Sequence, residues 1–118
     1  MQDLAPDIVR QRLLIEGLYA RDIDHRAVET YLIDVAAHLG LRTYGQPIVH
    51  APGGEGSAGN QGFDAFIPLI DSGISLYIWT QKRFFATVLF TCKRFDVNAA
   101  LRFTRDYFAA TDLEHRPF

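Results

Sequence analysis

An acidic residue followed by a serine could cut its own chain, because the serine hydroxyl can attack the peptide carbonyl that precedes it. Asp71 and Ser72 form such a pair, and Gly73 gives the backbone the freedom that a strained turn needs. Two strand-like stretches follow, and the second ends at Cys92, the single cysteine of the chain. Because a hairpin brings its open ends together, we expect Ser72 and Cys92 to be neighbours.

Self-cleavage at Asp71–Ser72 would turn the serine into a pyruvoyl group. Attack on the carbonyl gives an ester, while hydrogen-bond donors stabilise the tetrahedral oxyanion. A base then removes the Cα proton of the serine, the ester is eliminated, and hydrolysis leaves an N-terminal ketone. This pyruvoyl group, derived from Ser72, is the one cofactor that the sequence suggests. It could serve as the electron sink for decarboxylation of an amine, with Cys92 as the proton donor.

The same residues also allow a simpler interpretation. Ser72 can be an ordinary turn residue and Cys92 a small, buried apolar residue. Spacing alone favours this second interpretation, because Asp-Ser-Gly is a common turn sequence and lone cysteines are usually buried.

The composition indicates one domain over residues 1–118. Apolar residues make up 48% of the chain, enough for a two-layer core without disulfide bonds. The net charge is −2 and the longest basic runs are two pairs, Lys82-Arg83 and Lys93-Arg94, so no nucleic-acid partner is expected. The sequence shows neither a membrane-span pattern nor a signal-peptide pattern, and one cysteine fits a reducing compartment. We therefore expect no membrane partner and a cytoplasmic location.

The elements that position Ser72 and Cys92 follow from hydrophobic spacing. Asp24 and Asp96 are predicted to cap two helices that run to about Leu39 and Ala110, and Gly40 fits a left-handed C-terminal cap. The predicted strands cover residues 11–19, 41–50, 63–70, 74–80, 84–91 and 113–116, with residues 71–73 as a turn and residues 51–62 as a flexible, glycine-rich loop.

This order predicts an α+β fold: a two-layer α/β sandwich with an antiparallel-rich sheet and both helices on one face. The second face of the sheet would carry Tyr77, Trp79, Phe84 and Phe85, which are many aromatic side chains for a surface in water. We therefore expect a homodimer that covers this face. The histidines are scattered without the spacing of metal ligands, so no metal site is expected. They are His25, His38, His50 and His115.

Residues 71–92 resemble the processing site of the small bacterial and archaeal S-adenosylmethionine decarboxylases. That family's pattern is roughly Glu-Ser-His-x-x-x-His-Thr-Trp-Pro-Glu, followed by a strand that ends in Phe-Thr-Cys. In the same register, Ser72 falls on the pyruvoyl-forming serine, Trp79 on the tryptophan and Cys92 on the proton-donor cysteine, while Asp71 replaces the glutamate. The resemblance implies an α/β sandwich, dimers with active sites at or near the interface, and a role in polyamine (spermidine) biosynthesis.

Several positions depart from that family pattern. Tyr77 replaces the histidine that resembles the processing base, and a phenol with a pKa of about 10 is a poorer base than an imidazole at about 6.5. Asp64 replaces a serine that assists processing, and it adds negative charge where an oxyanion must form. Gln81 replaces a glutamate that contacts ribose, and it loses the charge-assisted part of that hydrogen bond. Gly73 and Thr80 replace a histidine and a proline.

Three functions remain open on these residues. The departures favour a divergent homologue that is not self-processed and that binds S-adenosylmethionine or a related amine, or that regulates an active decarboxylase. The alternative is an active pyruvoyl-dependent decarboxylase of S-adenosylmethionine or a basic amino acid, self-cleaving at Asp71–Ser72. A relative in fold alone is the third. The catalytic candidates are Asp71, Ser72, Tyr77 and Cys92, and the ligand-binding candidates are Asp64, Trp79 and Gln81.

Overall fold

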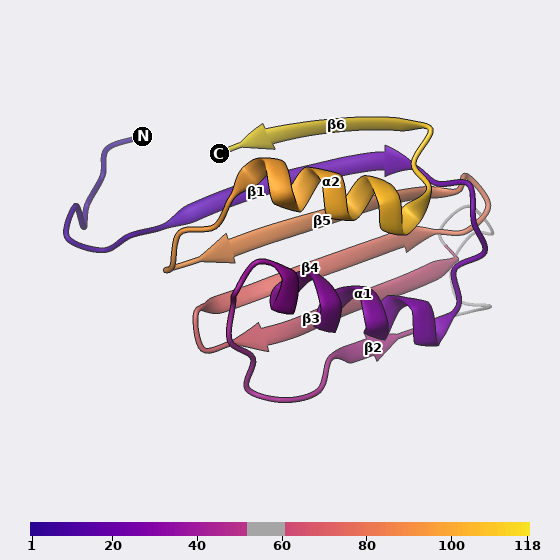
Figure 1. Ribbon diagram of the computed structural model, residues 1–118, viewed down its shortest axis with the longest axis horizontal. Helices are drawn as coiled ribbons and strands as arrows, with labels where there is room; N and C mark the ends of the chain where they lie inside the picture. The colour runs from indigo at the N-terminus through magenta and orange to yellow at the C-terminus, as the bar shows by residue number, and fades with distance from the viewer. Residues whose placement is uncertain (52–60) are drawn as a thin grey trace.

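The computed structural model describes residues 1–51 and 61–118, and these form one antiparallel sheet with two helices (Figure 1). Across the sheet the strand order is β2-β3-β4-β5-β1-β6, and each neighbouring pair is antiparallel. Both helices cover the same face, so the predicted α+β sandwich is confirmed. The strands are β1 (Gln11–Leu18), β2 (Ile48–His50), β3 (Gly62–Leu69), β4 (Ser72–Trp79), β5 (Phe84–Thr91) and β6 (Asp112–Pro117). The helices are α1 (His25–His38) and α2 (Val97–Phe108).

Both helices begin at the predicted aspartates. The side chain of Asp24 accepts a hydrogen bond from the backbone N–H of Ala27 at 2.8 Å, and Asp96 caps α2 in the same way. Gly40 follows α1 with a φ of +70°, the left-handed conformation that a glycine adopts without strain. The caps therefore set where each helix starts and where α1 turns back toward the sheet.

The core lies between the helices and one face of the sheet. Alternate residues of the central strands point into it, among them Ile74, Leu76 and Ile78 of β4, as period-two alternation predicts. From α2, Phe108 packs against Phe85, with ring centroids 4.2 Å apart. Phe85 is thus a core residue, and its predicted place on the second face is wrong. Successive residues of a strand point to opposite faces, so Phe84 and Phe85 cannot share one.

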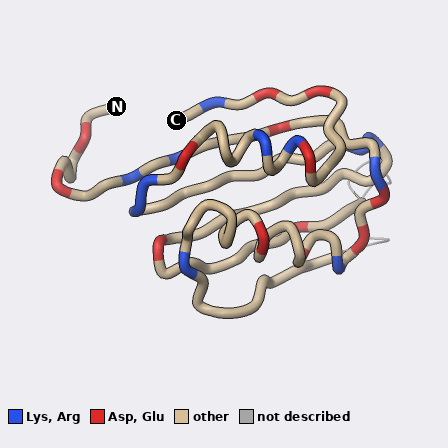
Figure 2. Tube along the Cα trace, in the orientation of Figure 1, with Lys and Arg blue, Asp and Glu red and all other residues tan. Residues whose placement is uncertain are grey.

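The face of the sheet that the helices leave uncovered is called the open face here. Strands β4 and β5, at its centre, carry no Lys, Arg, Asp or Glu, and Figure 2 shows this stretch free of charge colour. Several of its apolar side chains are substantially exposed. They include Leu18, Ile48, Phe66 and Phe90. Exposed apolar area of this kind on a sheet face is typical of a surface that another protein covers.

Two predicted boundaries are corrected by the structure. The strand predicted over residues 41–50 is reduced to the edge strand β2, because residues 41–44 instead contact the end of β3, where Thr43 forms an isolated bridge with Leu69. The turn after β3 consists of Ile70 and Asp71, so Ser72 is the first residue of β4 rather than part of a three-residue turn. Most of the predicted 51–62 loop lies outside the described residues.

In the part of the chain that the structure describes, no helix is both long and apolar enough to cross a membrane.

Candidate functional site

The Asp71–Ser72 peptide bond lies at the sheet end where β3 turns into β4. Ser72 pairs with Leu69 on β3 and with Thr91 on β5, which places Cys92 beside the bond that would be cut. The backbone N–H of Cys92 donates a hydrogen bond to the carbonyl oxygen of Asp71 at 2.9 Å. That oxygen would become the oxyanion if Ser72 attacked, so the Cys92 N–H already contacts the atom that must be stabilised.

Arg42, a residue that the sequence analysis missed, fixes the side chain of Asp71. Its Nη2 donates to Asp71 Oδ1 at 2.7 Å, its backbone N–H donates to Oδ2 at 3.0 Å, and its Nε lies 3.3 Å from Oδ2. Asp71 is only 2% exposed, whereas the Arg42 side chain is largely exposed. The hydrogen bonds from the Arg42 side chain and backbone hold the pKa of Asp71 at about 2, so the carboxylate stays charged.

The backbone of Ser72 is strained. Its φ is +114°, in the region that residues with a side chain rarely adopt. The strain falls on the one residue whose hydroxyl could attack the preceding bond, and the paired strands on both sides hold it in place. Arg42, Asp71, Ser72 and Cys92 together are called the junction below.

Cys92 is exposed, which corrects the interpretation of this cysteine as a buried apolar residue. It follows Thr91, whose buried hydroxyl donates to the carbonyl of Lys93 at 2.7 Å and so fixes the chain after β5. The ammonium of Lys93 donates to the carbonyl of Gly40 at 2.8 Å. The thiol therefore lies at a strand end whose backbone is fixed on both sides, and the charge of Arg42 is near it.

A second group lies in the middle of the open face. Asp64 of β3 is directly opposite Tyr77 of β4 and opposite His50 of β2. These three residues, called the middle cluster, line a hollow of about 240 Å³ together with Ser75 and Phe66. His50 is the second residue that the sequence analysis missed. Its signal was period-two alternation in the strand after α1, which places it on the same face as Tyr77.

The remaining two candidates lie at the opposite end of β4 from the junction. Trp79 is the last residue of the strand, on the open face, with its ring centroid 5.2 Å from that of Phe84. Gln81 is exposed in the turn between β4 and β5. An aromatic pair beside an exposed amide could contact a flat ring and a hydroxyl of a ligand.

Within one chain the candidates therefore form three separate groups. Tyr77 is five residues along β4 from Ser72, or about 16 Å at the rise of an extended strand. Trp79 is two residues farther along the same strand. A side chain spans less than half of such a distance, so one chain alone does not bring Tyr77, Asp64 or Trp79 to Ser72.

The packing of Phe66 explains one departure from the family pattern. Gly73 lies where the family pattern has a histidine, and a Cβ added to it would lie 2.5 Å from the ring of Phe66. Phe66 on β3 thus fills the space above position 73. The absence of a side chain at Gly73 leaves room for the ring of Phe66. An apolar ring on the open face therefore occupies the space next to the position where the family pattern has a histidine.

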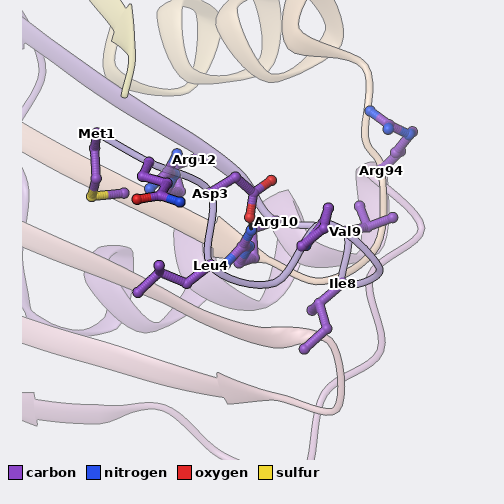
Figure 3. A pocket seen from close by; sticks show the side chains of 10 residues that line it. Met1, Asp3, Leu4, Ile8, Val9, Arg10, Arg12 and Arg94 are labelled. Carbon is purple, nitrogen blue, oxygen red and sulfur yellow. Dashed lines mark hydrogen bonds and ion pairs between the residues drawn. The ribbon is translucent and has the colours of Figure 1, made fainter.

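A separate hollow of about 380 Å³ lies between the N-terminal segment and the start of β1 (Figure 3). Arg10, Arg12 and Arg94 line it, and Arg10 is paired with Asp3. Arg12 lies opposite Phe90, whose other neighbour is Gly73, so this basic hollow is at the same end of the sheet as the junction. No junction residue lines it.

Within residues 1–51 and 61–118, no group of three His, Cys, Asp or Glu side chains is arranged to hold a metal ion.

The fold is that of one enzyme family. The sequence model of the S-adenosylmethionine decarboxylase family matches residues 16–118, so the chain belongs to this family. In fold it is similar to the crystal structure of the adenosylmethionine decarboxylase from Aquifex aeolicus VF5. The TM-score is 0.72 over 94% of this chain and 89% of that chain, with 15% sequence identity, a level that shows the fold alone. No curated protein sequence gives a significant match.

The family uses a pyruvoyl group, and the junction suits the formation of one. Ser72 has the strained backbone, and the Asp71 carbonyl oxygen already accepts the Cys92 N–H. If formed, the group would supply an electron sink at the first residue of β4. Of the chain's own residues, Cys92 would hold a transferable proton beside it, and Arg42 would keep the end of the preceding fragment in place.

Proposed function

We propose that this chain is a divergent S-adenosylmethionine decarboxylase homologue that binds S-adenosylmethionine or a related amine and is not split into two fragments between Asp71 and Ser72. The observation that carries this proposal is the chemistry of Tyr77 and Asp64, because neither side chain supplies the imidazole or the hydroxyl that the family pattern has at these positions. The chain keeps the frame around Ser72 and lacks the histidine that would complete the reaction. A binding or regulatory role in polyamine metabolism follows from the family.

The proposal includes a homodimer formed through the open face. Three apolar side chains on this face, Ile48, Phe66 and Phe90, are 54%, 40% and 42% exposed, and the central strands carry no charge to oppose burial. If two such sheets packed face to face in opposite directions, with the two-fold axis between positions 72 and 77 of β4, the middle cluster of one copy would approach the junction of the other. A second copy would thereby unite groups that one chain keeps about 16 Å apart.

In that arrangement the ligand would contact residues of both copies. Asp64 supplies a carboxylate for a sulfonium or ammonium group, and Trp79 supplies a ring face for an adenine or for a cation. Gln81 can still hydrogen-bond a hydroxyl group, although without the charge of the glutamate in the family pattern. A ligand that lacks ribose, such as a basic amino acid, would lose little affinity from having Gln81 in place of that glutamate.

The junction and His50 favour an active decarboxylase as the second candidate. His50 lines the same hollow as Tyr77 and Asp64, and an imidazole is a suitable base near neutral pH. From the partner's middle cluster it could remove the Cα proton of Ser72. This candidate predicts self-cleavage and loss of that cleavage in His50→Gln, with His25→Gln on the outer surface of α1 as a matched control.

Intact-mass measurement combined with calorimetry tests the two candidates. The proposal predicts a single species of 13.3 kDa after prolonged incubation, and saturable heat with S-adenosylmethionine that Trp79→Ala and Asp64→Asn weaken about tenfold. Fragments 1–71 and 72–118, with a pyruvoyl mass on the second, would instead establish the active decarboxylase. Absence of heat with S-adenosylmethionine and with basic amino acids would contradict both and leave only the shared fold.

A further inference from the structure

We propose that Arg42 is a positioning residue for the junction: it holds the Asp71–Ser72 bond in the conformation from which the serine hydroxyl attacks, so that the chain reaches the ester but goes no further. This inference rests on the proposed function, in which the chain is not split, because the ester still joins residues 71 and 72 and is not eliminated. It assigns a role to a residue that neither the sequence pattern nor the family match singles out.

Arg42 holds the β3–β4 turn both through its N–H donors and through its carbonyl oxygen. Three of its N–H groups lie within 3.3 Å of the Asp71 carboxylate, and its carbonyl oxygen accepts the N–H of Ile70 at 2.8 Å. Both turn residues, Ile70 and Asp71, are therefore tied to one residue of the segment that follows α1. Asp71 cannot rotate about its backbone without breaking several of these bonds, three of them charge-assisted because they end on the ionised carboxylate.

The carbonyl of Asp71 is fixed from the other side by Cys92. The hydrogen bond from the Cys92 N–H, at 2.9 Å, comes from the strand end that pairs with the start of β4. Because Arg42 holds the side chain and Cys92 holds the carbonyl, the orientation of the scissile peptide is determined at two points. A donor that is already in place needs no reorganisation when negative charge develops on the oxygen.

The φ of +114° at Ser72 brings its Cβ toward the carbonyl carbon of Asp71. The angle φ describes where the carbonyl carbon of Ser72 lies about its N–Cα bond, and Cβ is displaced from that carbon by the tetrahedral geometry at Cα. At this φ, Cβ is therefore nearly eclipsed with the carbonyl carbon of Asp71. Attack by the serine Oγ closes a five-membered ring through these atoms, and the ring requires such an eclipsed arrangement. An extended serine with negative φ would first have to rotate.

The step needs no co-reactant. A bond forms between the Oγ of Ser72 and the carbonyl carbon of Asp71, the peptide C–N bond breaks, and the hydroxyl proton ends on the released nitrogen of Ser72. The ester that results persists only if its Cα proton is not removed. Tyr77, which stands in the place of the family's base, lies about 16 Å along β4 in the same chain and is a poor base from a partner.

Neutral hydroxylamine tests this inference, because it cleaves esters far faster than amides and the chain contains no Asn-Gly sequence. Folded wild-type protein should yield fragment 1–71 as a hydroxamate and fragment 72–118 with a free serine amine. Urea-unfolded protein and Ser72→Ala should remain intact. Arg42→Met should slow the cleavage at least tenfold and Arg42→Lys should restore part of the rate, whereas Arg26→Met on the exposed side of α1 should leave it unchanged.

Melting curves for each variant separate positioning from folding. If Arg42→Met does not fold, Asp71→Asn provides the second variant, because it keeps the backbone contact and loses the ion pair; it should slow cleavage several-fold. No cleavage of folded wild type would overturn the inference while leaving the proposed function intact. Equal rates for wild type and Arg42→Met, at equal folded fractions, would overturn the role of Arg42.

If the purified wild type is already split and carries a pyruvoyl group, the proposed function is wrong but the role of Arg42 is still tested. Maturation in Arg42→Met should then be at least tenfold slower than in wild type and in Arg26→Met. Maturation at the wild-type rate would overturn the role of Arg42 in this case also.

Discussion

The backbone N–H of Cys92 donates a hydrogen bond of 2.9 Å to the carbonyl oxygen of Asp71, across the start of the β4–β5 pair. The cysteine thus meets the scissile bond through its main chain, while its thiol is exposed. Two functions at one residue can therefore be separated. In the proposed chemistry, the N–H would stabilise the oxyanion that forms at the Asp71 carbonyl, and the thiol would serve any later proton transfer to a substrate.

Replacement of the thiol should leave the junction unchanged. Cys92→Ala removes an exposed side chain and keeps the N–H, so we expect a change in unfolding free energy within about 0.5 kcal/mol and an unchanged rate of hydroxylamine cleavage. Cys92→Pro removes the donor itself and should slow cleavage strongly at an equal folded fraction. Mass spectrometry after hydroxylamine treatment measures both. Equal cleavage in the proline variant would show that the N–H is not needed.

The stability of the protein should change with pH through Asp71. Its pKa is about 2 in the folded chain, lowered from an ordinary 3.8 by the hydrogen bonds from Arg42. A lowered folded pKa means that its contribution is fully present above pH 4 and is lost as the pH falls toward 2. Urea unfolding should show wild type more stable than Asp71→Asn at pH 7, with the difference shrinking between about pH 4 and pH 2. A constant difference would contradict the ion pair.

Two glycines of the β3–β4 hairpin should respond differently to alanine. A Cβ at Gly62 would lie 1.7 Å from the backbone oxygen of Ile78, which cannot move without breaking the strand pair. A Cβ at Gly73 would clash with the far end of the Phe66 ring alone, since its next neighbour, the backbone oxygen of Ile67, is at an ordinary 3.5 Å, and Phe66 is 40% exposed and can turn away. We expect Gly62→Ala to lose about 3 kcal/mol or more of unfolding free energy and Gly73→Ala less than about 1 kcal/mol. Equal losses would mean that Phe66 is fixed.

The homodimer predicts that a charge on the open face disrupts association. Phe66→Glu introduces a carboxylate at a side chain that is 40% exposed on this face, and Ile33→Glu introduces one at a 39% exposed position of α1. Sedimentation should show twice the 13.3 kDa mass for wild type and Ile33→Glu, and a single chain for Phe66→Glu. A monomeric wild type at high micromolar concentration would contradict the dimer and the shared site.

Much of the fold follows from local signals in the sequence. Asp24 and Asp96 mark the helix starts, and strand β5 was predicted with both of its bounds, because alternation and capping depend on nearby residues. The strand predicted over residues 41–50 was too long, since the partner of residues 41–44 is the end of β3, far along the chain. Phe85 was assigned to the wrong face because β5 has apolar residues at adjacent positions, and such a run does not show which of them point to the core.

The candidate site was predictable only where a motif marks it. Asp71, Ser72 and Cys92 are marked by the motif, and the structure brings them together. Arg42 carries no signal in the sequence, because an exposed arginine after a helix is ordinary until its buried carboxylate partner is known. The φ of Ser72 was equally hidden, since it results from strand pairing on both sides and from no local preference.

The claim that the chain stays unsplit for lack of a base is tested most directly by restoring one. The intact mass of the variant with Tyr77→His and Asp64→Ser should be measured beside wild type and beside the same variant carrying Ser72→Ala. The account predicts that wild type stays at 13.3 kDa, that the restored variant splits into fragments 1–71 and 72–118, and that Ser72→Ala prevents the split. A restored variant that stays intact as long as wild type, or a wild type that is already split, would contradict it.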